Sequence, residues 1–119
     1  MYTSTIVVTD DRTAKEMGSG ELPVLATPAL VALMENAAMN LAAEYLSEGE
    51  TTVGSSIEVK HLAPSALGAT VSATATLQER DGRRLSFVIE ARDGETVVGT
   101  ATHTRFIVNV AKFMSKLTK

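Results

Sequence analysis

The chain of 119 residues suits one domain, and 45% of its residues are hydrophobic, which is enough to build a core. Its formal net charge is −3 and its basic residues are scattered, which argues against nucleic acid as a partner. It has no cysteine, which excludes disulfides, and its two histidines lack a metal-binding spacing, so we expect no metal and no bound cofactor.

The N-terminus lacks the basic leader and apolar run of a signal peptide, and the longest apolar stretch, 29–34, is too short to cross a bilayer. We therefore expect a cytoplasmic protein without a membrane partner, folded as a single domain over residues 1–119. A chain this short has a high surface-to-volume ratio, which pairing with a second copy would reduce.

The first half of the chain predicts one strand and one long helix. Residues 5–8 form a β-branched run typical of a strand, and 10–20 have no clear period, which favours a loop or covering segment. Thr27 is a good N-cap for a helix over 28–46, and Gly49 suits the left-handed conformation after its end. The apolar stripe of this helix comprises Leu30, Met34, Ala37, Ala38, Leu41 and Tyr45.

The second half predicts an antiparallel sheet. Its four strands are expected at 51–62, 70–80, 83–92 and 95–108. Asp-Gly pairs at 81–82 and 93–94 indicate hairpins, and the tail 109–119 is ambiguous, with a short helix as one reading. One helix covers only one face of such a sheet, which gives an α+β domain. A long central helix wrapped by a curved antiparallel sheet of about five strands is the hot-dog fold.

Two polar side chains lie where apolar ones are expected. Glu35 sits mid-helix, about 40° beyond the edge of the apolar stripe at 3.6 residues per turn. It is either a boundary carboxylate reaching solvent or a half-buried carboxylate that acts as a base. His61 shares its side-chain parity with Ile57 and Val59 and so points to the apolar face of its strand. It is either a core histidine or, paired with a carboxylate, a charged group or an acid.

Three further residues have both a structural and a functional interpretation. Thr27 is either simply the N-cap or a hydroxyl facing a cleft at the helix start, where developing negative charge is favoured. Gly54 interrupts a β-branched run, which indicates a bulge or a close approach of the backbone to a ligand. Arg105, which shares a parity with His103, is either in an ordinary ion pair or binds a carboxylate or phosphate. A basic group beside the first hairpin reads as a solvated turn: Arg80, Arg83 and Arg84.

The sequence resembles the fluoroacetyl-CoA thioesterase family of hot-dog proteins. The likeness covers most of the chain from about residue 22 onward, with matching spacing between the key positions. The matching segments are 24–27 (VLAT), 29–35 (ALVALME), 48–50 (EGE), 53–54 (VG), Val59, His61, 81–87 (DGRRLSF), Gly99, Thr102-His103, Arg105 and Lys112-Phe113.

The resemblance implies an acyl-CoA thioesterase whose catalytic residues are Thr27, Glu35 and His61. It also implies that the backbone N–H of Gly54 helps to hold the thioester oxygen and that Arg105 is an active-site residue that binds substrate. Water, or the Glu35 carboxylate itself, would attack the thioester carbonyl. The resemblance further implies a homodimer, or a higher oligomer, with coenzyme A lying near the interface as part of the substrate.

Two departures from the family pattern bear on the substrate. Pro28 stands where the family has glycine after the threonine, and residues 20–23 contain no aromatic residue where the fluoroacetyl-specific enzyme has an aromatic gate. We therefore expect a short or medium acyl-CoA as substrate. The alternative is a non-catalytic hot-dog protein that binds acyl-CoA or a small ligand; a purely structural dimer and a dehydratase are the other readings.

Overall fold

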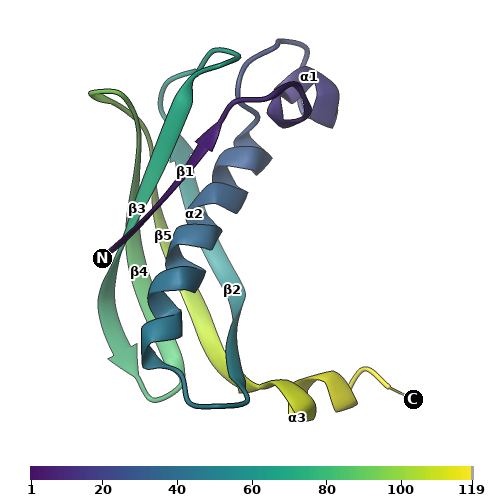
Figure 1. The fold of residues 1–119 in the computed structure, drawn as a ribbon, viewed down its shortest axis with the longest axis vertical. Coiled ribbons are helices and arrows are strands. Elements are labelled where there is room, and N and C mark those ends of the chain that lie inside the picture. The colour runs from purple at the N-terminus through teal and green to yellow at the C-terminus, as the bar shows by residue number, and fades with distance from the viewer. Residues whose placement is uncertain (119) are drawn as a thin grey trace.

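The computed structural model describes residues 1–118, which form one long helix lying across an antiparallel sheet (Figure 1). The strands are β1 (Tyr2–Val7), β2 (Glu50–His61), β3 (Thr70–Asp81), β4 (Arg84–Asp93) and β5 (Thr96–Asn109). The helices are α1 (Ala14–Met17), α2 (Thr27–Ala42) and α3 (Val110–Ser115), and 3-10 turns cover Asp10–Arg12 and Ala43–Tyr45. The expected α+β class with a five-stranded sheet is confirmed.

The strands follow the order β1-β3-β4-β5-β2, and each neighbouring pair is antiparallel. Both predicted hairpins are present, with Gly82 and Gly94 each at φ 61°, a region that glycine enters without steric cost. Within residues 1–118 the long strand β2 pairs only with β5, so its other edge is open. The sheet curves around one side of α2, as Figure 1 shows.

The core lies between α2 and the inner face of the sheet. The predicted alternation of β3 is confirmed, because Val71, Ala73 and Ala75 are fully buried. Gly99 of β5 is needed for the close approach of the helix, since a methyl group there would lie 2.9 Å from Leu30 Cδ2. The predicted helix stripe is buried at five of its six positions: Leu30, Met34, Ala37, Ala38 and Leu41.

Tyr45 is the exception in that stripe, since 37% of it is exposed. The α-helix ends at Ala42 and continues as a 3-10 turn, whose different period carries the tyrosine away from the sheet. Its ring is covered instead by Arg80, whose guanidinium carbon lies 5.7 Å from the ring centroid. The expected helix end near residue 46 is correct only if this turn is included.

Of the two readings of the segment 10–20, a loop or a covering segment, the loop is wrong, because the segment contains a 3-10 turn and the short helix α1. Thr13 is buried, its side chain accepts a hydrogen bond from the Glu16 N–H, and its backbone bridges to Leu25. A helix of four residues is too short to show a period in the sequence, which explains the error. No helix within residues 1–118 is long and apolar enough to span a membrane.

Candidate active site

The Thr27 hydroxyl lies 2.8 Å from Nδ1 of His61. Thr27 is the first residue of α2, the N-cap position falls on Ala26, and no side chain of the described residues 1–118 caps the helix. The predicted capping role of Thr27 is therefore wrong. The hydroxyl is used by His61 because β2 ends beside the start of α2, a proximity that exists only in the folded chain. The pair lines a groove of about 360 Å³ together with Leu25 and Pro64.

His61 is half-buried, and its Nε2 atom is buried without a hydrogen-bond partner among residues 1–118. Burial lowers the pKa of His61 below its ordinary value of 6.5, so the imidazole is neutral near pH 7. An unpaired buried nitrogen costs about 1–3 kcal/mol. This cost is removed if a polar group from outside the chain reaches Nε2.

Glu35 lies elsewhere, against the middle of β2 and β5. It is half-buried, and its carboxylate, His103 and Arg105 converge on Gly54. A methyl group at Gly54 would lie 3.1 Å from Glu35 Oε2, 3.3 Å from His103 Cε1 and 3.4 Å from Arg105 Nη1. The predicted bulge at Gly54 is observed, because the β2–β5 register shifts between Gly54 and Ser56.

The Arg105 side chain is held in place by three hydrogen bonds. Its Nε donates to the Thr52 hydroxyl at 2.9 Å, and its Nη2 donates to the Thr52 carbonyl at 3.0 Å. Its Nη1 lies 3.3 Å from His103 Nε2. Burial lowers the pKa of Arg105, and the nearby Glu35 carboxylate opposes that shift. Arg105 is thus a buried cation near the Glu35 carboxylate, so of the surface or interface ion pair expected from the sequence only the surface form is wrong.

His103, which shares a parity with Arg105 and belongs to a segment that matches the family, lies in the same cluster. Its Nδ1 lies 2.8 Å from the Ser56 carbonyl, which can only accept, so Nδ1 carries the proton. In the neutral ring Nε2 then accepts from Arg105 Nη1. Burial lowers the pKa of His103, and the Arg105 charge adds to this. His103 is therefore a neutral acceptor that orients the guanidinium.

One chain does not bring Thr27, Glu35 and His61 around a single cleft. Glu35 contacts β2 at Gly54, and His61 lies seven residues further along, about 23 Å at the strand rise. On α2, Thr27 and Glu35 are eight residues apart, about 12 Å at the helix rise. The described chain therefore presents two half-sites: the Thr27–His61 pair, and the Glu35 cluster comprising Glu35, Gly54, His103 and Arg105.

Replacing Gly54 with alanine is expected to lower turnover without unfolding the protein. The added methyl group would meet Glu35 Oε2 at 3.1 Å and displace the carboxylate by some tenths of an ångström. If Glu35 is the reacting group that the sequence predicts, misplacing it in this way lowers kcat by about 10-fold to 100-fold. Steady-state kinetics measures the loss, with the neighbouring Ser55→Ala variant as control. Unchanged kcat in Gly54→Ala would show that the close approach at Gly54 is dispensable.

Stability is expected to fall as the pH drops below 6.5. Because the folded-state pKa values of His61 and His103 are lowered, the unfolded chain binds more protons between those values and 6.5. The contribution of these two histidines to the free energy of unfolding is therefore complete above pH 6.5. It is lost as the pH falls through their pKa values in the folded protein. Thermal unfolding from about pH 5 to 8 measures this slope. The slope should be smaller in His103→Gln; an equal slope would contradict the assignment to this histidine.

Comparison with known proteins assigns the fold and the family. Residues 8–111 match the family described as fluoroacetyl-CoA-specific thioesterase. The fluoroacetyl-CoA thioesterase of Streptantibioticus cattleyicolor is 42% identical over 94 residues, which are 79% of this chain and 68% of that protein.

Solved structures agree with this match. The fluoroacetyl-CoA-specific thioesterase FlK superposes with a TM-score of 0.90 at 37% identity, covering 98% of this chain and 90% of that chain. A thioesterase superfamily member from Thermus thermophilus gives a TM-score of 0.89 at 29% identity, covering 98% of this chain and 86% of that chain. A hot-dog-like protein from Thermanaerovibrio acidaminovorans gives 0.87 at 25% identity, covering 97% and 85%. The chain has the hot-dog fold and belongs to the fluoroacetyl-CoA-specific thioesterase family.

Proposed function

We propose that this protein hydrolyses a short or medium acyl-CoA thioester to the free acid and coenzyme A, at a site built by two copies of the chain. The observation that carries the proposal is the pairing of Thr27 with His61, whose buried Nε2 has no partner among residues 1–118. The family supports thioester hydrolysis, and a phenylalanine-to-alanine mutant of FlK was solved in complex with fluoroacetate and CoA.

The second copy is proposed from the open edge of β2. If two β2 strands pair antiparallel about a two-fold axis between Ile57 and Glu58, Gly54 of one copy lies opposite His61 of the other. Because Glu35 contacts Gly54, its carboxylate then approaches the His61 Nε2 of the partner copy. Such a dimer contains two complete sites, each combining the Glu35 cluster of one copy with the Thr27–His61 pair of the other. It also covers the exposed strand edge.

The chemistry follows from the groups so joined. Glu35 accepts a proton from a water molecule whose oxygen attacks the thioester carbonyl, or the carboxylate attacks directly and water hydrolyses the resulting anhydride. The oxyanion of the tetrahedral intermediate is held by the Gly54 N–H. When Thr27 donates to Nδ1, His61 carries its proton on Nε2 and gives it to the sulfur as the C–S bond breaks. Arg105, held by His103 and Thr52, binds the acyl end.

Thiol release tests the proposal directly. A panel of CoA esters from acetyl to long chain is followed with a thiol-reactive dye, with Glu35→Gln as the control and a chelator present in a parallel series. We expect turnover of short or medium esters, unaffected by the chelator because no metal takes part. Tight binding of CoA esters without thiol release would instead support the non-catalytic binding protein. Turnover of long-chain esters alone would contradict the proposed substrate class.

A further inference from the structure

A second concave site lies at the far end of β2 and β5, beside α3. It is a groove of about 420 Å³ that neither half-site uses. Its charged lining residues are Glu48, Glu50, Arg83, Lys112 and Lys116. Its three cations and two carboxylates give the groove a formal charge of +1, although the chain as a whole carries −3.

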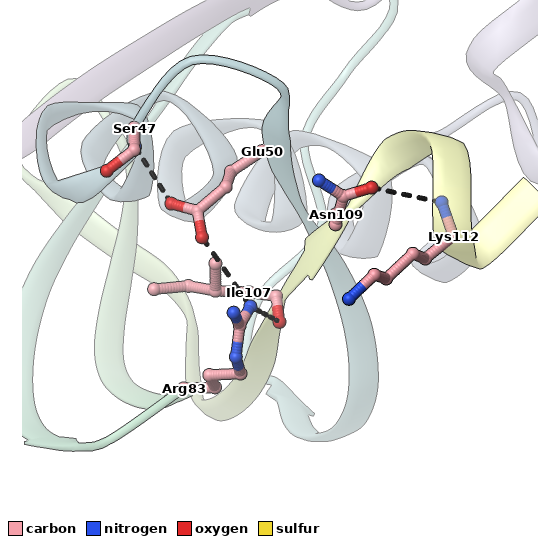
Figure 2. Close-up of polar contacts among 6 residues, drawn as sticks. All are labelled: Ser47, Glu50, Arg83, Ile107, Asn109 and Lys112. Carbon is pink, nitrogen blue, oxygen red and sulfur yellow. Dashed lines mark hydrogen bonds and ion pairs between the residues drawn. The ribbon is translucent and has the colours of Figure 1, made fainter.

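The carboxylate of Glu50 is already engaged by partners inside the fold. Its Oε1 accepts a hydrogen bond from the Ser47 N–H at 2.8 Å, and its Oε2 lies 3.5 Å from Arg83 Nη1. Arg83 also donates to the Ile107 carbonyl at 3.2 Å, so it crosses from the hairpin onto β5, as Figure 2 shows. Arg83 lies in the turn with 63% of its side chain exposed, in agreement with the predicted solvated turn, and it also forms one wall of the groove.

The other two cations are Lys112, within α3, and Lys116, the residue that follows its end. The Asn109 side chain accepts from the Lys112 N–H at 3.0 Å and caps this helix, which fixes its direction beyond β5. Lys112 and Lys116 are four residues apart, and both line the groove. Figure 2 shows the Lys112 side chain reaching back toward the side where Arg83 lies. Within residues 1–118, neither lysine has a carboxylate within ion-pair distance.

We propose that Lys112 and Lys116, with Arg83 as the fixed wall, bind phosphate groups of the nucleotide end of the CoA ester. Lysine ammonium groups without a protein carboxylate suit phosphate oxygens, and Phe113 adds an aromatic ring to the lining. The groove begins at the Glu50–Asn109 pair, four residues along β2 from Gly54, about 13 Å at the strand rise. The pantetheine arm of CoA bridges such a separation. This inference rests on the proposed function for the placement of the thioester.

The test compares three esters of one acyl group: acyl-CoA, acyl-3′-dephospho-CoA and acyl-pantetheine. The Lys112→Ala/Lys116→Ala variant should raise KM for acyl-CoA about tenfold or more while kcat is unchanged, because each lost phosphate contact weakens ground-state binding. KM for acyl-pantetheine should equal that of the wild type. If the variant no longer raises KM for the dephospho ester, the lysines bind the 3′-phosphate. If it still raises KM for that ester, they bind the diphosphate.

Controls separate this site from general charge effects. Lys112→Arg/Lys116→Arg should keep the wild-type KM, and Lys15→Ala/Arg92→Ala, which removes two cations elsewhere, should leave it unchanged. An unchanged KM for acyl-CoA in the Lys112→Ala/Lys116→Ala variant, or an equal rise for acyl-pantetheine, overturns the proposal. If no ester is hydrolysed, calorimetric binding of CoA decides the matter separately. Weaker CoA binding in the alanine variant then supports the groove even though the hydrolase proposal has failed.

Discussion

Glu35→Gln is expected to lower kcat for acyl-CoA hydrolysis by about 10²–10⁴, the range for removing a general base or nucleophile. Glutamine matches glutamate in size but neither takes a proton from water nor attacks a carbonyl. The carboxylate is half-buried and forms no ion pair within 4.0 Å among residues 1–118, so the melting temperature should change little. Thiol release and thermal unfolding measure the two effects.

The matched control is Glu44→Gln, which makes the same chemical change at an exposed position in the 3-10 turn after α2. It should retain wild-type kcat. Full activity in Glu35→Gln would remove this carboxylate from the mechanism, whichever of the two attack routes operates. A large drop in melting temperature would mean that the variant reports on folding rather than on catalysis.

Mixed dimers should restore activity that both parent variants lack. Glu35→Gln and His61→Gln homodimers each carry one lesion in every composite site and are expected to be inactive. A heterodimer of the two has one site with both lesions and one site with neither, so about half of the wild-type activity should return. Two affinity tags isolate this heterodimer, and thiol release measures it.

The reciprocal heterodimer is the control. Wild type paired with the Glu35→Gln/His61→Gln double variant has one lesion in each composite site, so it should be inactive. If each chain held a complete site, this heterodimer would keep half of the activity and the first one would have none. The two preparations thus give opposite results for a composite and an intrachain site, and activity only in the reciprocal pair would reject the composite site.

The strand and helix pattern was largely predictable because it depends on local periodicity. The alternation of β3 and the Asp-Gly turns at Gly82 and Gly94 depend on neighbouring residues alone, and both agree with the structure. The errors, α1 and the exposure of Tyr45, fall where an element is too short or changes its period. There the outcome depends on what packs against the segment.

The candidate residues could be named from the sequence, but the groups that their side chains contact could not. Thr27 bonds to His61 rather than capping α2 because β2 ends beside the start of that helix. His103 and Arg105 form one buried network because the β-bulge after Gly54 places the Ser56 carbonyl at hydrogen-bond distance from the His103 ring. A parity argument assigns a side chain to a face, but it does not choose the atom that the side chain meets.

The sequence by itself therefore determined the fold class, most element boundaries and the residue types able to do thioester chemistry, because these depend on interactions between near neighbours in the chain. Only the tertiary structure decided that Thr27 contacts His61 and that Glu35 lies at Gly54, about 23 Å away along β2. That separation depends on strand register and on the path of α2 across the sheet. Both are set by contacts between residues that are distant in the sequence.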